Sequence, residues 1–324
     1  MGSSKLTAAR VREIYQRQKP GRFGPLYKAA QRAVRGEAPS LSEASPMHSD
    51  RLQRQVHALS QPESAAVPVA LHHPLCFEML DQHALSVTAQ RHPMHGHPKA
   101  KALSLPTTSG TLAIAERLQV LHLHPRVLEV DPRSPTKDSR WIPAPWLGDL
   151  LLFMTDEAGP YCVSWDIKRN PGDHGKPGPR RGARLPTRKD ILKADAREAV
   201  YVEFMRELGI RIVRIHLGTF DEYLVANLRR LLEMQTQAID LPPQVHADAV
   251  LDYQRAMQEG RPPSVVIEAY RSKGFDRLEI KRVLAQAIWQ RHIRIDLFRP
   301  WSVDVPLMPE LKDPLVEYAD CFRR

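Results

Sequence analysis

The chain has 324 residues, 42% hydrophobic and 26% charged, which is long enough for two or three domains that each bury a core. Its 47 lysines and arginines exceed its 37 acidic residues, and the formal charge of +10 favours a polyanionic partner, with nucleic acid fitting better than an acidic protein. No run of about 18 apolar residues is present and no apolar signal region follows Met1, which argues against membrane insertion and predicts a cytoplasmic protein.

The first third of the chain separates into a basic stretch and a polar one. Residues 5–35 are rich in lysine and arginine with aromatic residues between them, which predicts a basic helical arm broken at Pro20. Such an arm suits a phosphate clamp or a docking element, and a solvated helical face would have the same composition. Residues 36–66 turn to Ser, Pro, Glu, Gln and Ala, which is typical of a linker or a weakly ordered insert. We therefore expect residues 1–104 to form a basic N-terminal arm and a low-complexity insert.

A helix and a short strand are predicted next. Residues 107–110 have the composition of a helix N-cap, and leucine and alanine at helical spacing predict a helix over 111–124. A strand over 127–130 and a connecting loop over 132–145 follow. The histidines lie mostly in loop-like surroundings and the three cysteines are far apart, so we expect neither a zinc site nor disulfides.

The stretch 145–169 carries the strongest chemical signal. Two apolar runs flank a turn-like segment at 155–160, which predicts a β-hairpin. The alternation of side chains along a strand puts Asp166 and Lys168 on one face, and an antiparallel partner can bring Asp149 opposite them. Two carboxylates and one ammonium group are therefore expected to converge.

That constellation suits phosphodiester hydrolysis. Two acidic side chains can hold one or two Mg²⁺ or Mn²⁺ ions, which polarise the phosphate and lower the pKa of an attacking water. The lysine adds positive charge where anionic charge develops, or orients the water. The alternative is a purely structural hairpin with one buried aspartate and a surface Asp/Lys pair. An aspartate before Leu-Leu-Leu on a buried strand is nonetheless costly unless it is paired or metal-bound.

A loop rich in glycine and proline follows the hairpin over residues 169–188. Next to an acidic metal site, basic side chains on such a loop are well placed to hold a DNA backbone, although a plain solvated loop would have the same composition. The expected DNA-binding residues are Lys176, Arg180, Arg181, Arg184 and Arg188.

The remaining pattern defines the fold class. A helix over 189–208, a strand over 210–217 and a helix over 220–237 complete an α/β sandwich around a small mixed sheet. This order is the skeleton of a restriction-endonuclease-like, PD-(D/E)XK core, which we place at residues 105–240. Three helical segments and a strand over 293–298 predict a winged-helix domain at residues 241–324.

Taken together, residues 105 to 310 resemble TnsA, the endonuclease subunit of heteromeric-transposase transposons. The resemblance rests on the helix leading into 124–130, on Asp149, on Asp166-Ile167-Lys168 where the family has Gln-Val-Lys or a relative, and on the helices and strand that follow. It implies a bacterial, divalent-metal nuclease that cuts the DNA strand which the partner transposase, TnsB, leaves uncut. It also implies assembly with TnsB and with the ATPase regulator TnsC.

The sequence departs from the family at the first acidic residue. The family carries an acid on its first core helix, but ungapped alignment from Val127 places Ile114 there, with Glu116 two positions later. Two positions are about 200° around a helix, so Glu116 reaches the metal only if the register shifts. We expect Glu116 to be the fourth catalytic residue, with Glu203 as another candidate.

Three hypotheses follow from these residues. The leading one is a Mg²⁺- or Mn²⁺-dependent endonuclease of the TnsA type, in which Asp149 and Asp166 bind the metal and Lys168 stabilises the transition state. The alternative is a catalytically inactive adaptor that bridges the transposase and its ATPase, which is motivated by the displaced first-helix acid. The third is a restriction-type or defence nuclease that uses the same core without a transposase.

Overall fold

A computed structural model describes residues 6–38, 43–130, 139–178 and 185–324. Its centre is a four-stranded mixed sheet, so the α/β class is confirmed. The strands are, in spatial order, β10 (Arg211–His216), β9 (Gly159–Lys168), β8 (Leu147–Asp156) and β3 (Cys76–Ala84). The pairs β3/β8 and β8/β9 are antiparallel and β9/β10 is parallel. The predicted hairpin is confirmed, with Asp156 paired to Gly159 across its turn.

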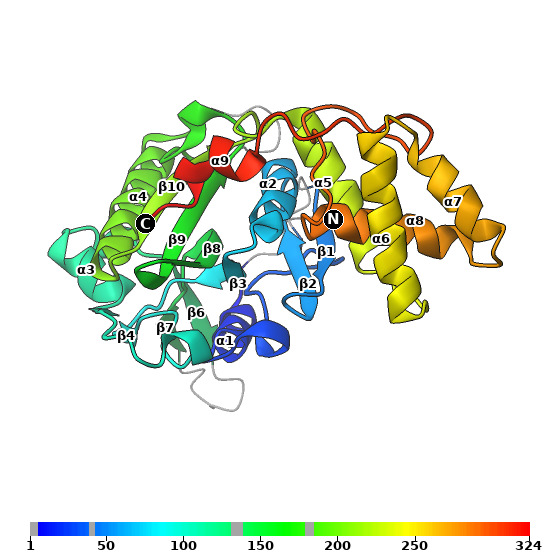
Figure 1. Cartoon of the computed structure of the whole chain (residues 1–324). Coiled ribbons are helices and arrows are strands. Elements are labelled where there is room, and N and C mark those ends of the chain that lie inside the picture. The colour runs from blue at the N-terminus through cyan, green and yellow to red at the C-terminus, as the bar shows by residue number, and fades with distance from the viewer. Residues whose placement is uncertain (1–5, 39–42, 131–138, 179–184) are drawn as a thin grey trace.

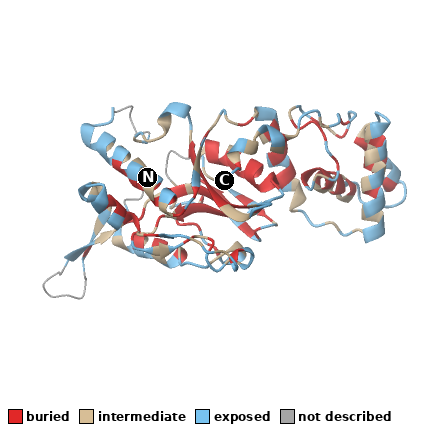
Figure 2. Cartoon of the chain, turned by 60° about the vertical axis from the view of Figure 1, so that its left-hand side comes forward, coloured by how far each residue is buried: buried red, intermediate tan, exposed pale blue. Residues whose placement is uncertain are grey.

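Helices cover both faces of this sheet, since its middle strands are apolar on both sides. The helices α2 (Gln61–His72) and α5 (Glu222–Gln235) pack on the face that carries Leu150, Leu152 and Trp165. The helices α3 (Thr111–Arg117) and α4 (Arg188–Glu207) pack on the opposite face, against Leu151 and Phe153. Figure 1 shows β8 and β9 lying between α4 and α2. In Figure 2 the buried residues follow the sheet and the inner sides of these helices.

The expectation of a weakly ordered insert over 36–66 is wrong for the residues that the structure describes. A hairpin of β1 (Ser45–Ser49) and β2 (Arg54–Ala58) leads into α2, which is followed directly by the sheet strand β3. The many polar residues misled the composition argument, because small apolar side chains, among them Ala66, Val67 and Ala70, are buried and let α2 lie close to the sheet. The sheet thus draws on residues from both sides of the boundary expected at 104/105.

The predicted strand at 127–130 forms, but it is not part of the central sheet. It is β6 (Arg126–Val130), which pairs only with β7 (Ser139–Pro143) in a two-stranded ribbon. Figure 2 shows this ribbon extending from the body with mostly exposed residues. The helix that precedes it, α3, is therefore not the helix that leads into the first strand of the sheet. A second small pair joins β4 (Gln90–Arg91) to β5 (Thr107–Thr108).

The predicted basic arm begins with α1 (Ala8–Arg17) and is packed against the rest of the protein. The Tyr15 hydroxyl donates to the Pro143 carbonyl on the ribbon, and the Ala84 amide of β3 donates to the Gln18 side chain. The Glu37 carboxylate accepts hydrogen bonds from Arg10, Arg17 and Arg32. Part of the basic character of this segment therefore serves internal ion pairs. Short 3₁₀ turns occur at Gly24–Leu26, Pro98–Ala100, Leu121–Leu123, Pro171–Asp173 and Ala319–Cys321.

Three helices follow the sheet, as predicted. They are α6 (Pro243–Gln258), α7 (Pro263–Arg271) and α8 (Arg277–Trp289), and α8 packs on α5. The strand expected over 293–298 is absent from the described residues, where an isolated bridge between Ile295 and Pro309 takes its place. The Asn227 amide of α5 binds the carbonyls of Leu297 and Arg299, so these carbonyls are not free to pair in a strand ladder.

The last part of the chain returns to the central sheet. It includes α9 (Pro314–Glu317), and its Phe322 ring lies 5.2 Å from the ring of Trp165 on β9. The Trp165 indole donates to the Cys321 carbonyl at 2.7 Å. Of the helices in the described residues, none has the length and apolar character needed to cross a membrane.

Candidate active site

Two aspartates and a lysine meet at one end of the β8–β9 hairpin. Leu150 and Trp165 are the last cross-strand pair at this end, and Asp149 directly precedes the first while Asp166 directly follows the second, so the antiparallel register brings the two aspartates side by side. The Lys168 ammonium lies 3.0 Å from Asp149 Oδ2 and also binds the Asp166 carboxylate. Asp149 Oδ2 accepts a hydrogen bond from the Ile167 amide at 2.7 Å, which fixes the carboxylate. The predicted convergence of these three side chains is confirmed.

The charges of this group stabilise one another. Burial lowers the pKa of the Lys168 ammonium, but the Asp149 and Asp166 carboxylates raise it more, so its pKa lies above the ordinary lysine value. Burial raises the pKa of Asp166, but Lys168 and His174 together lower it by more, so its pKa lies below the ordinary aspartate value. Lys168 is therefore protonated and Asp166 is ionised at neutral pH.

A third carboxylate, Glu63, comes from α2. It is 6% exposed and accepts hydrogen bonds from the Leu59 amide and the Ser60 hydroxyl, both at 2.8 Å, and from the Gln82 amide of β3 at 2.7 Å. Burial and the neighbouring negative charge of Asp149 raise the pKa of Glu63 to about 7. Glu63 is not among the acids expected from the sequence, although a capping-box signature, Ser60 followed three residues later by Glu63, precedes an apolar run.

Glu116, expected as the fourth catalytic residue, is not brought to this group. Its side chain is exposed on α3, and no contact among the described residues links it to Asp149 or Lys168. The alignment misplaced it because it assumed that the helix before residues 127–130 leads into the sheet, whereas that strand belongs to the separate ribbon. Glu203 is also engaged elsewhere, in ion pairs with Arg117 and Arg206.

A histidine that the sequence analysis did not single out completes the group. His174 Nδ1 lies 2.6 Å from Asp166 Oδ2, and the histidine side chain is only 3% exposed. A turn at Pro171–Asp173, closed by reciprocal hydrogen bonds between Asn170 and Asp173, carries the chain back toward β9. The Asn-Pro-Gly-Asp sequence is a turn signal that could have been recognised, but its target could not.

A cleft of about 350 Å³ opens beside Asp166 and Lys168. Lys176 lines it, in agreement with the predicted basic loop, and Lys193 and Arg197 contribute from α4. Its lining is of mixed charge, because Asp190 and Glu198 take part as well. Of the other expected DNA-binding residues, Arg188 is exposed at the first residue of α4, and Arg180, Arg181 and Arg184 lie outside the described residues.

The oxygen atoms at this end of the sheet suit a hard divalent cation. The carboxylates of Asp149 and Asp166 meet there, and Mg²⁺ and Mn²⁺ prefer such oxygen ligands. Lys168 shows that the two aspartates converge on a single positive charge, since its ammonium group binds both. Within the described ranges, no group of three or more His, Cys, Asp or Glu side chains is gathered closely enough to form a ready-made metal site. A cation held by Asp149 and Asp166 would need water or substrate oxygens to complete its shell.

Comparison with known proteins assigns this chain to no family. The chain matches no protein-family model, and no match is found among curated proteins. The side chains at the end of the β8–β9 hairpin are therefore the basis on which its chemistry is argued.

Proposed function

We propose that this chain is a Mg²⁺- or Mn²⁺-dependent DNA endonuclease of the TnsA type. It would cut the non-transferred strand at transposon ends, together with a TnsB-like transposase and a TnsC-like ATPase. The observation that carries the proposal is the convergence of Asp149, Asp166 and Lys168. The net positive charge of the chain supports a polyanionic substrate.

The topology supports a restriction-endonuclease-like core for this activity. The elements follow one another as helix α2, antiparallel strands β3, β8 and β9, helix α4 and parallel strand β10. The acidic and basic side chains project from the end of the central hairpin, as the PD-(D/E)XK arrangement requires. The three helices α6 to α8 support a winged-helix-like domain whose wing is reduced to the bridge at Ile295.

In this proposal three acidic side chains would bind the metal, and Lys168 would bind the phosphate or the attacking water. Asp149, Asp166 and Glu63 would bind the metal, which when present supplies a Lewis acid for the phosphate and a more acidic water. Lys168 stays protonated because of its raised pKa, so it can donate hydrogen bonds to the anionic phosphate or to the attacking water. The β8–β9 hairpin keeps these groups in register through its backbone ladder.

The cleft beside the site would accept the DNA backbone. Lys176, Lys193 and Arg197 are placed along it, and their contacts to phosphates would position the strand without reading its sequence. Weak, salt-sensitive binding by the chain alone is expected, since few phosphate contacts are available on this surface.

The decisive test is strand-specific cleavage of a transposon-end duplex with Mg²⁺ or Mn²⁺ and the candidate transposase and ATPase. Asp149→Ala and Lys168→Ala should each reduce cleavage of the non-transferred strand by roughly 10²-fold or more while the protein still joins the assembly. Arg229→Gln, at an exposed position on α5, serves as the matched control and should cut normally. Cleavage of that strand at the control rate by both site variants would refute the nuclease assignment.

The same reaction separates the other two hypotheses. An inactive adaptor would leave only the cut made by the transposase, whichever variant is present. A restriction-type or defence nuclease would cleave DNA without the transposase and ATPase.

A further inference from the structure

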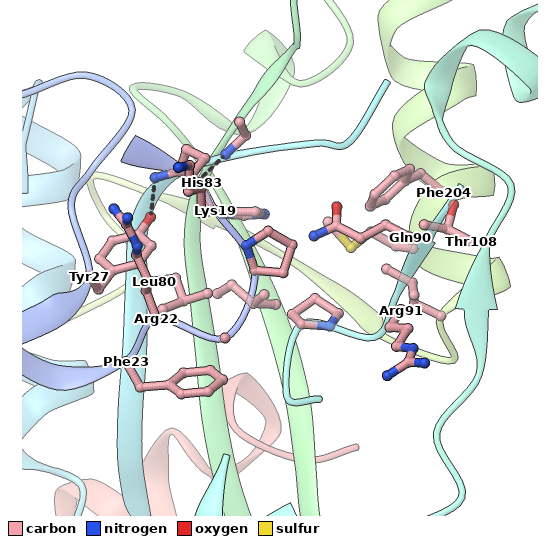
Figure 3. A pocket seen from close by; sticks show the side chains of 18 residues that line it. Lys19, Arg22, Phe23, Tyr27, Leu80, His83, Gln90, Arg91, Thr108 and Phe204 are labelled. Carbon is pink, nitrogen blue, oxygen red and sulfur yellow. Dashed lines mark hydrogen bonds between the residues drawn. The ribbon is translucent and has the colours of Figure 1, made fainter. Parts of the chain in front are cut away.

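A second cavity lies on the α4 side of the sheet and is separate from the cleft. It has a volume of about 70 Å³ and is enclosed by residues 18–23 of the N-terminal segment, by β4 and β5, and by the C-terminal half of α4. Figure 3 shows these segments surrounding it from several sides. On a scale of about 10–15 Å³ for each water, the space would hold about five waters, so a small ring fits and a peptide does not.

The floor of this cavity is apolar and partly aromatic. Leu80 and Leu151 come from the sheet and Met205 from α4, and all three are buried. Phe204 and Phe23 also line it and lie on opposite sides of it in Figure 3. A flat, weakly polar ring is the kind of group that such a surface accepts, because it stacks on aromatic rings and is sheltered from water.

Two polar side chains line the cavity, the buried His83 and the half-buried Gln90. His83 is 6% exposed, and neither of its ring nitrogens has a hydrogen-bond partner among the described residues. Burial lowers the pKa of His83 to about 4, so its neutral ring offers one donor and one acceptor. The Gln90 amide reaches in from β4 (Figure 3) and offers a donor and an acceptor as well. Leaving the ring nitrogens of the buried His83 unpaired is costly, and a ligand that pairs with them would be stabilised.

The rim carries positive charge that is not neutralised locally. Lys19, Arg22 and Arg91 all line the cavity, and none of its lining residues is acidic. Within the described part of the chain, Arg22 donates to the Gln16 carbonyl, Arg91 contacts His95, and none of the three pairs with a carboxylate. The occupant is therefore expected to carry an anionic group beside its ring.

The cavity lies next to the strand that carries the candidate active site, because His83, which lines the cavity, packs on Gly148, the residue before Asp149. His83 faces Gly148 across the β3–β8 pair, and a Cβ atom on Gly148 would lie 2.2 Å from His83 Cε1. The histidine ring therefore rests on the backbone immediately before Asp149. A ligand that touches His83 lies next to the strand that carries the reaction site.

We propose that this cavity binds one nucleotide unit, with its base on the apolar floor against His83 and Gln90 and its phosphate toward Lys19 and Arg91. Two sources share this chemistry. One is an extrahelical nucleotide of the DNA next to the cleaved phosphate, and this source rests on the proposed function. The other is a free nucleotide.

Two measurements on the full chain distinguish these sources. Binding of dAMP is followed by calorimetry, which requires no nuclease activity. Binding of an end duplex that carries 2-aminopurine at successive positions around the cut is followed by fluorescence in Ca²⁺, in the presence of the transposase and ATPase. An unstacked 2-aminopurine in the cavity should raise the fluorescence severalfold at one position.

His83→Phe and Met205→Trp are the informative variants. The first keeps an aromatic ring and removes two unpartnered nitrogens, and the second fills the cavity. His83→Phe should weaken dAMP binding and reduce the fluorescence rise by roughly 5-fold to 100-fold, the range expected for one buried hydrogen bond, and Met205→Trp should abolish both. Arg229→Gln is the control, and circular dichroism checks the fold of each variant.

The possible outcomes are distinct. A fluorescence rise that His83→Phe removes assigns the cavity to DNA, and dAMP binding alone assigns it to a free nucleotide. Binding that both variants leave unchanged, or no response to either probe from a protein that still cuts DNA, overturns the nucleotide site and leaves the nuclease proposal intact. If dAMP binds the cavity while the duplex is never cut, the nuclease proposal fails and the nucleotide site stands.

Discussion

His174 holds one oxygen of Asp166 while Lys168 binds the other. The histidine is almost fully buried and is reached through a turn, so the contact is built into the fold rather than made by a mobile surface side chain. A group that donates to a metal-binding carboxylate fixes its orientation and tunes its affinity for the ion. We therefore regard His174 as a positioning residue for the proposed metal site.

Substitutions at position 174 test this role. His174→Asn keeps an amide donor close to the place of Nδ1, whereas His174→Leu has a similar size and no donor. His174→Leu should weaken Mn²⁺ binding by roughly 10-fold to 100-fold, and His174→Asn should retain most of it. Electron paramagnetic resonance of free Mn²⁺ measures this without reference to cleavage. Equal losses in the two variants would show that the hydrogen bond does not position Asp166.

Substitutions of Glu63 and Glu116 test which of these two glutamates is the additional acidic residue of the proposed site. Glu63→Gln keeps the side chain's size and its acceptor for the Leu59 amide but removes the charge next to Asp149. Cleavage should fall by roughly 10²-fold or more in this variant, since a proposed metal ligand loses its carboxylate. Glu116→Gln alters an exposed side chain on α3 and should leave cleavage unchanged. The reverse result would restore the register that the sequence alignment assumed.

Among the secondary-structure elements, the hairpin was predictable because everything that defines it is local. Two apolar runs, a turn and the alternation of side chains suffice to place Asp149, Asp166 and Lys168 together. The helix α2 and the strand β3 were not predictable in the same way. β3 pairs with β8 across an insertion of more than 60 residues, and α2 uses small apolar side chains between polar ones. Glu63 was not expected at the site because the helix α2, which carries it, was not predicted.

The packing of α2 can be tested by overfilling it. Ala66 is fully buried in the core that α2 shares with the sheet, so Ala66→Leu should destabilise the protein by about 1–3 kcal/mol. Ala113 is exposed on α3, and Ala113→Leu should change the stability by less than about 0.5 kcal/mol. Urea unfolding followed by circular dichroism compares the two. Equal stability of both variants would show that Ala66 is not tightly packed, as expected if residues 36–66 were a weakly ordered insert.

At the scale of the whole molecule, the contact between α2 and the C-terminal helices contains a buried histidine. His72 packs its ring 5.2 Å from that of Trp289 on α8, and neither of its nitrogens has a partner in the described ranges. Burial and the nearby charges of Arg291, Arg51 and His73 lower the pKa of His72 to about 3, while Asp313 raises it slightly. The folded protein therefore keeps this ring neutral.

This arrangement makes the stability sensitive to acid. Because the folded pKa of His72 lies below its ordinary value of 6.5, its contribution is fully present above that pH. It is lost as the pH falls from 6.5 toward about 3, by an amount on the order of a few kcal/mol. His72→Phe should reduce this loss while leaving the stability at pH 8 unchanged or higher. Thermal unfolding between pH 4 and 8 checks it, and parallel curves for both proteins would contradict it.

The arrangement of the C-terminal part was only partly open to prediction. Its three helices are defined by local periodicity and by the glycines and prolines between them. The absence of the expected strand depends on Asn227, whose amide binds two carbonyls about 70 residues away, and no local pattern contains that information. The return of the chain end to Trp165 is equally non-local.

The chain end also has a mechanical consequence. The helical lobe α6 to α8 is joined to the sheet twice, once by the segment after α5 and once by the tail, whose Arg324 binds Asp156 and the Gly159 carbonyl at the hairpin turn. Two connections, together with the packing of α8 on α5, restrict the motion of the lobe more than one connection would. A partner bound to the helices α6 to α8 would therefore stay at a nearly constant distance from Asp149. In a nuclease, such an offset would set the number of base pairs between the recognised sequence and the cut.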